Sequence, residues 1–149
     1  TLSTAEIYNS FLSEDRGKTF FHGHSYTANA LACAVALESL DILEDENILG
    51  RISRMEELFK ERLQKLESLP VVHSTRAIGS LAAMDVVVGE PGEGGYLDAI
   101  GPRLYAEFLK RDILLRPLGN VLYFLPPYVI TDEEIHRVFD AIEEVLGGL

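Results

Sequence analysis

A run of aromatic and turn-forming residues that passes directly into an alanine-rich segment constrains the fold more than any other stretch. Residues 20–34 read FFHGHSYTANALACA. Alanine and leucine favour a helix, and Ser25, Thr27 and Asn29 each stand where a helix cap would fall. A helix start beside glycine and hydroxyl residues can bind an anion, because its unpaired amides and the helix dipole point the same way. The residues predict a capped helix able to hold a phosphate or carboxylate, although a structural cap without a ligand is the commoner outcome.

Two helices are predicted in the first half of the chain. Residues 29–43 are apolar nearly all round, which predicts burial on more than one side and an inert, buried thiol at Cys33. Residues 48–69 form the second helix, and Pro70 ends it. Its apolar residues recur at spacings of three and four, as in an amphipathic helix: Ile48, Ile52, Met55, Phe59, Leu63 and Leu66.

The second half alternates between strands and helices. Residues 71–76 and 80–88 are predicted strands, with a bulge or bend at Gly79. A helix over residues 96–111 follows, and then two short apolar strands that flank a hairpin turn at residues 117–120. Thr131 caps a last helix, with Glu134 at the capping-box spacing. This order predicts an α+β fold in which a small, mostly antiparallel sheet is covered by helices on one face.

Composition and charge exclude several classes of function. The chain has 149 residues, enough for one domain with a proper core, and 47% of them are hydrophobic. A formal net charge of −11 argues against nucleic acid or an anionic membrane as a partner. No apolar run approaches the ~20 residues that a membrane span needs. One cysteine cannot form an internal disulfide, and this fits a cytoplasmic protein.

An arginine at the end of a predicted strand is a second candidate for a binding residue. Arg116 precedes Pro117, which keeps the arginine backbone extended. A guanidinium in that place can bind a carboxylate through two parallel hydrogen bonds. A structural ion pair is the alternative that the residues leave open.

The histidines do not predict a metal centre. His22 and His24 flank Gly23, so a metal pair is conceivable, but no third ligand of a suitable type lies nearby in the sequence.

Residues 21–33 resemble a segment of the class III aminotransferases, which use pyridoxal 5'-phosphate (PLP). The resemblance implies that Ser25 binds the cofactor phosphate of the neighbouring subunit in a homodimer, with His24 beside it, and that Gly23 belongs to the substrate site. It also implies the C-terminal small domain of fold-type I PLP enzymes over residues 29–149. Residues 1–28, including the phosphate-contacting loop, are then carried over from the large domain.

The second half resembles the branch of this family that acts in biotin synthesis. The resemblance lies in four stretches: GYL at 95–97, IGPR at 100–103, LRPLGN at 115–120, and Tyr123 with PPY at 126–128. It implies that Arg116 binds the carboxylate of the keto substrate. The implied reaction converts 8-amino-7-oxononanoate to 7,8-diaminononanoate with S-adenosylmethionine as amino donor.

Transamination also needs a lysine that forms a Schiff base with the cofactor. Four lysines are present, and none stands at the end of a buried strand: Lys18, Lys60, Lys65 and Lys110. The family resemblance implies that the cofactor lysine lies upstream of residue 1. We therefore expect an inactive chain on its own, with much of its first long helix exposed as an apolar patch. The alternatives are another class III ω-amino acid transaminase and a stand-alone α+β ligand-binding or interaction domain.

Overall fold

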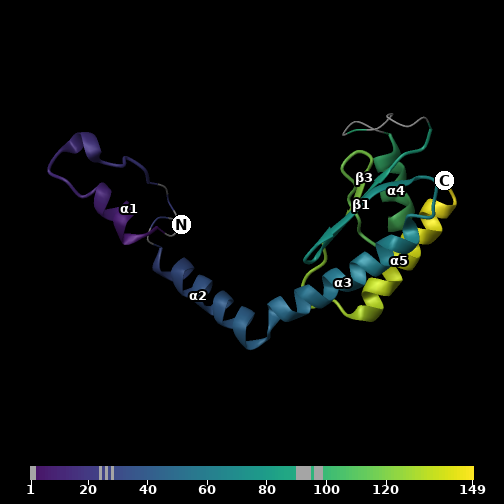
Figure 1. Ribbon diagram of the computed structural model, residues 1–149, viewed down its shortest axis with the longest axis horizontal. Coiled ribbons are helices and arrows are strands. Elements are labelled where there is room, and N and C mark those ends of the chain that lie inside the picture. The colour runs from purple at the N-terminus through teal and green to yellow at the C-terminus, as the bar shows by residue number, and fades with distance from the viewer. Residues whose placement is uncertain (1–2, 24, 26, 28, 90–94, 96–98) are drawn as a thin grey trace. The chain divides into compact units, whose positions relative to one another are not determined.

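The computed structural model describes residues 3–23, 25, 27, 29–89, 95 and 99–149 (Figure 1). The chain divides into two compact units, Thr1–Asp41 and Ile42–Leu149. Along the chain the elements are α1 (Ala5–Ser10), a 3₁₀ turn η1 (Arg16–Lys18), α2 (Ala30–Asp45), α3 (Ile48–Leu66), β1 (Val72–Ile78), β2 (Leu81–Val86), α4 (Ile100–Leu109), β3 (Val121–Phe124) and α5 (Asp132–Gly147). The predicted division at residues 28 and 29 concerns domain origin rather than these compact units, and it stays a prediction.

In the first unit, side chains cap both helices. Thr4 accepts the amide of Ile7 at the start of α1, at 3.3 Å. Of the three residues predicted as caps for α2, Asn29 fills the role, because its side-chain oxygen accepts the Ala32 amide at 3.0 Å. The helix start predicted from the sequence is therefore confirmed.

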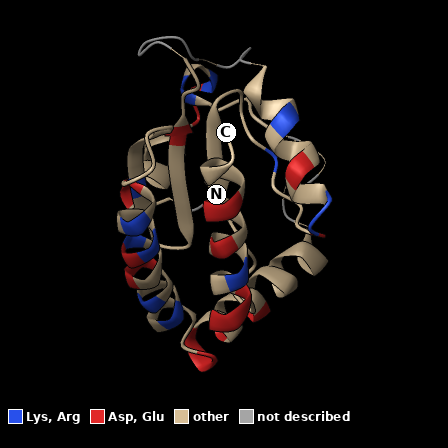
Figure 2. Cartoon of the chain, turned by 90° about the vertical axis from the view of Figure 1, so that its right-hand side faces the viewer, with Lys and Arg blue, Asp and Glu red and all other residues tan. Residues whose placement is uncertain are grey.

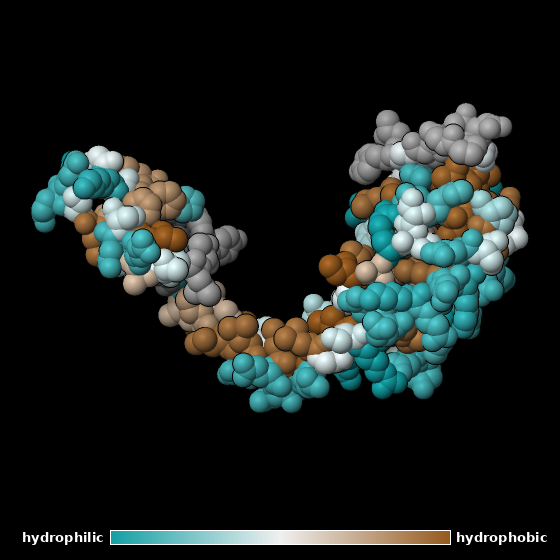
Figure 3. All heavy atoms as spheres, in the orientation of Figure 1, coloured by the Kyte–Doolittle hydropathy of each residue, from teal (hydrophilic) through white to brown (hydrophobic). Residues whose placement is uncertain are grey.

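The burial predicted for α2 is wrong for this structure. No residue of α2 is buried, and apolar side chains gather along one side of α2 on the face that Figure 3 shows. Cys33, predicted as a buried thiol, is exposed. Burial needs a second apolar layer, and α1, the other helix of this unit, has no buried residue either. The expected exposed apolar patch is present and includes Leu31, Val35, Leu37 and Leu40.

The second unit is built on an antiparallel sheet with the order β1–β2–β3. β1 and β2 form a hairpin closed by Gly79 and Ser80, and Gly79 has a φ of +53°, which glycine adopts without strain. The bend predicted at Gly79 is thus this hairpin turn. A separate irregularity of register lies in β1 between His73 and Arg76.

One face of the sheet forms the core with the helices. Alternation along β2 and β3 directs Ala82, Met84, Leu122 and Phe124 into that core. The three rings of Phe59, Phe124 and Phe139 meet there, with centroids 5.5 to 5.9 Å apart. The predicted α+β fold, with helices covering one face of a small antiparallel sheet, is confirmed.

Among the described residues three ion pairs connect α3 to α5, one of them between Arg62 and Glu143 at 3.9 Å. Arg54 pairs with Asp132, and Arg62 pairs with Asp140. The guanidinium carbon of Arg62 also lies 5.7 Å from the centroid of the Phe139 ring. Acidic and basic residues lie close together on the outer helical surfaces of this unit (Figure 2).

The first of the two strands predicted around the 117–120 turn does not form. Residues 113–116 alternate in burial, with Ile113 and Leu115 inside, yet they join no ladder of the sheet. β3 pairs with β2 instead. Its partner is therefore a strand from earlier in the chain and not residues 113–116, which directly precede the turn. The turn itself is present, because Leu118 and Val121 exchange two backbone hydrogen bonds at 2.9 and 3.0 Å.

The capping box predicted for the last helix is confirmed and can be tested. The Thr131 hydroxyl accepts the Glu134 amide at 3.2 Å, and the Glu134 carboxylate accepts the Thr131 amide at 2.9 Å. Thr131→Ala leaves that helix amide without its acceptor, so we expect it to lower the free energy of unfolding by about 1 kcal/mol in urea titrations. Thr131→Ser keeps the oxygen and serves as the matched control. Equal losses in the two variants would contradict a capping role.

Candidate functional site

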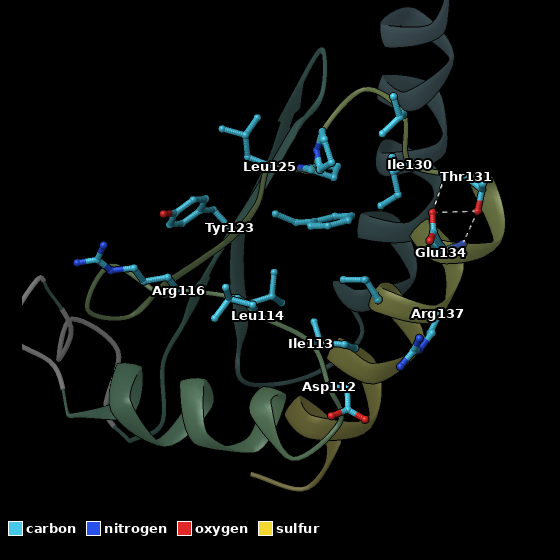
Figure 4. A pocket seen from close by; sticks show the side chains of 16 residues that line it. Asp112, Ile113, Leu114, Arg116, Tyr123, Leu125, Ile130, Thr131, Glu134 and Arg137 are labelled. Atoms are coloured by element: carbon cyan, nitrogen blue, oxygen red, sulfur yellow. Dashed lines mark hydrogen bonds between the residues drawn. The ribbon is translucent and has the colours of Figure 1, made fainter.

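Arg116 lies at the edge of a pocket in the second unit. The pocket has a volume of about 780 Å³ and is bounded by residues 112–116, by β3 with the loop after it, and by the first two turns of α5. Figure 4 shows Arg116 and Tyr123 pointing to one side, with Glu134 and Arg137 on the other side along α5. Apolar side chains, among them Leu114 and Leu125, lie between these two polar ends.

Local chemistry fixes the backbone at Arg116. Pro117 follows it and excludes the helical region for the arginine backbone. Gly119 then closes the turn with a φ of +60°, a left-handed conformation that glycine accepts. The guanidinium is exposed and stands beside the pocket, where it can meet an anion. This geometry agrees with the carboxylate-binding role predicted from the sequence, and that role stays a prediction.

Tyr123 lines the pocket, and no role was predicted for it. It lies between Leu122 and Phe124, both buried in the core, so alternation places its ring on the opposite face of the sheet. In register it stands opposite Ala83, which pairs on its other side with Arg76. The alternation could be predicted from the sequence. That Tyr123 lies near Arg116 could not, because it depends on the path that residues 113–116 take in the fold.

Arg76 on the same face has a structural partner. Its guanidinium lies 2.9 Å from the carboxylate of Asp85 on the neighbouring strand. This ion pair gives Arg76 a structural role between the two strands.

The other predicted site residues belong to the first unit. Ser25 is exposed in the turn that precedes α2, and Gly23 is exposed with nothing within 4 Å of where a Cβ would stand. His24 lies outside the described residues. Ser25 belongs to the first unit and Arg116 to the second.

None of the lysines has the surroundings of a Schiff-base residue. Hydrogen bonds to the carboxylates of Glu56 and Glu57 raise the pKa of Lys60, the opposite of what an amine nucleophile at neutral pH needs. Lys65 and Lys110 pair with glutamates four and three residues before them, at 3.0 and 2.6 Å, and Lys18 is exposed. The expectation that the cofactor lysine lies upstream of residue 1 stays a prediction.

Two features are absent from the described part of the chain. Among those residues no group of three or more histidine, cysteine, aspartate or glutamate side chains is arranged to hold a metal ion. No helix among them is long and apolar enough to cross a membrane.

Comparison with known proteins gives a consistent result along the whole chain. Adenosylmethionine-8-amino-7-oxononanoate aminotransferase from Synechococcus elongatus is 43% identical over 149 residues, covering 100% of this chain and 34% of that protein. The crystal structure of the protein of the same name from Methanocaldococcus jannaschii has a TM-score of 0.84 and 37% identity, covering 97% of this chain and 34% of the other. An omega transaminase from Pseudomonas jessenii, solved in complex with PMP, has a TM-score of 0.75 and 25% identity, covering 86% of this chain and 29% of the other.

The chain spans about a third of the length of the curated relatives that it matches. The family pattern described as aminotransferase class III matches residues 1–146. This match takes in both the loop at Ser25 and the turn at Arg116. The chain therefore belongs to the class III aminotransferases.

Proposed function

We propose that this chain provides the C-terminal part of an adenosylmethionine-8-amino-7-oxononanoate aminotransferase. That enzyme transfers an amino group from S-adenosylmethionine to 8-amino-7-oxononanoate, giving 7,8-diaminononanoate for biotin synthesis. The position of Arg116 carries the proposal, because an exposed guanidinium on a fixed turn beside a partly apolar pocket suits a substrate with a carboxylate and an alkyl chain. Relatives of that name, which match nearly the whole chain, support the substrate assignment.

Class III aminotransferases are PLP-dependent, and the loop before α2 fits a contact to the cofactor phosphate. Ser25 offers an exposed hydroxyl donor, and open space surrounds the nearby Gly23. Asn29 already accepts an amide of the first turn of α2, so the phosphate contact is assigned to the loop, with Ser25 and His24 as ligands. PLP, when bound, supplies the electron sink for amino transfer. The residues of this chain hold its phosphate and orient the substrate.

The two candidate contacts serve different subunits in this proposal. Ser25 binds the cofactor phosphate of the neighbouring subunit, whereas Arg116 and Gly23 act on the keto substrate, so the active enzyme is a homodimer with shared sites. Residues 1–28 belong to the large domain and residues 29–149 to the small domain. We place the enzyme in the cytoplasm, where the exposed thiol of Cys33 stays reduced.

A second candidate function is another ω-amino acid transaminase of the same class. The likeness to the omega transaminase from Pseudomonas jessenii favours it. The two candidates differ in substrate. Assays of a complete enzyme with 8-amino-7-oxononanoate and with the substrates of ω-amino acid transaminases therefore separate them.

The experiment combines an assay with covalent trapping. We expect a complete enzyme that ends in these residues to convert 8-amino-7-oxononanoate with S-adenosylmethionine, and borohydride to trap PLP on a lysine outside them. The 149-residue chain treated with PLP and borohydride should show no specific lysyl adduct by peptide mass spectrometry, because its described lysines are exposed or paired with glutamates. A stoichiometric adduct on Lys18, Lys60, Lys65 or Lys110 would contradict the proposed division of roles. A complete enzyme that accepts other ω-amino acids but not S-adenosylmethionine would support the second candidate.

A further inference from the structure

α4 approaches the turn that follows Arg116 so closely that only glycine fits at the contact. Gly101 is buried in the first turn of α4. A Cβ added there would stand 2.7 Å from the carbonyl oxygen of Gly119 and 3.5 Å from its carbonyl carbon. Both are backbone atoms, so the clash is not relieved by rotating a side chain. Glycine is a poorer helix former than alanine, so helix propensity does not explain a glycine here. The lack of room for a side chain does.

The turn is held on its other sides by backbone hydrogen bonds. The Asn120 amide donates to the carbonyl of Gly95 at 3.2 Å, and the Asn120 carbonyl accepts the Val86 amide at 2.8 Å. Leu118 and Val121 exchange two further bonds across the turn. The surroundings therefore leave the turn little room to retreat from α4 without breaking one of these bonds.

We propose that Gly101 is a positioning residue for Arg116. Because Gly101 has no side chain, α4 packs directly against the turn and sets its position. The backbone at Arg116 and Pro117 is restricted, so the position of the turn determines where the guanidinium lies. A side chain at residue 101 would push the turn and move Arg116 away from the substrate carboxylate. The inference rests on the proposed function, because Arg116 must bind that carboxylate for the displacement to matter.

The first test is Gly101→Ala in the complete holoenzyme. We expect KM for 8-amino-7-oxononanoate to rise about ten-fold, with kcat and KM for S-adenosylmethionine within two-fold of their original values. Gly147→Ala is the matched control, since it is also a glycine in a helix but has nothing within 4 Å of the added Cβ. An unchanged KM for the keto acid in a folded Gly101→Ala enzyme would overturn the proposal.

A double-mutant cycle separates positioning from general structural damage. If Gly101 acts through Arg116, Gly101→Ala should raise KM no further in an enzyme that already carries Arg116→Ala. The same ten-fold rise in both backgrounds would overturn the positioning role and leave the proposed function standing. An Arg116→Ala enzyme with an unchanged KM for the keto acid would overturn the proposed function, and the role of Gly101 with it.

A structural measurement tests the contact without any assay. In the 149-residue chain, Gly101→Ala should shift the amide NMR signals of Gly119 and Asn120, whereas Gly147→Ala should leave them in place. Unmoved signals would overturn the proposal. If Gly101→Ala does not fold, Gly119→Ala strains the turn at its positive φ and leaves α4 intact. It should then raise KM for the keto acid selectively, and equal changes for both substrates would overturn the proposal.

Discussion

Arg116→Ala in the complete enzyme is expected to raise KM for 8-amino-7-oxononanoate about 100-fold, because it removes two charge-assisted hydrogen bonds to the substrate carboxylate. The exposed guanidinium stands on a turn fixed by Pro117 and Gly119, so no other described arginine replaces it at that edge of the pocket. The half-reaction with S-adenosylmethionine should change far less. Steady-state kinetics with each substrate varied in turn, together with single-turnover measurements, check the split.

Two further variants make that result specific. Arg116→Lys keeps the charge but loses the two-pronged geometry, so it should recover only part of the affinity for the keto acid. Arg103→Ala removes an exposed arginine on α4 and serves as the control for net charge. Equal rises in KM for both substrates after Arg116→Ala would remove the assignment of this residue to the keto acid.

Phe139→Ala should cause the largest loss of stability in the second unit. The ring is fully buried, packs edge-on against Phe124 at 5.9 Å and contacts Phe59 at 5.6 Å. Its removal leaves a cavity and deprives the Arg62 guanidinium of an aromatic face. We expect the free energy of unfolding to fall by about 3–5 kcal/mol. That is a large share of the roughly 5–15 kcal/mol typical of a domain, so the urea midpoint should drop sharply.

The control is a phenylalanine with little packing to lose. Phe21 is 77% exposed, so Phe21→Ala should change the free energy of unfolding by less than about 0.5 kcal/mol. Comparable losses for the two variants would show that the ring cluster is not the centre of the fold.

The helices and their caps were predictable because their signals are local. Thr131 and Glu134 specify a helix start through groups three residues apart, and the stripe through Met55 and Phe59 specifies a buried face. The partners of extended segments were not predictable in the same way. Residues 113–116 alternate as a strand does, but whether they join the sheet depends on which segment occupies the edge of β2, and β3 does.

The same distinction between local signals and long-range packing applies to the residues of the candidate site. Arg116 was identified from its place before Pro117 and beside a turn, all within a few residues. Tyr123 as its neighbour and Gly101 as the close contact of the turn depend on packing between distant segments. The exposure of Cys33 was missed for a related reason, because an apolar sequence indicates what a helix can bury and not whether a partner is present.

Two of the ion pairs between α3 and α5 show how these helices are aligned. Arg54 with Asp132 and Arg62 with Asp140 both join residues 78 positions apart. A constant separation along both partners means that the helices run in the same direction with matched rise, so their dipoles point the same way and repel each other. Three acidic residues in the first turn of α5, Asp132, Glu133 and Glu134, oppose that repulsion where positive partial charge would otherwise accumulate.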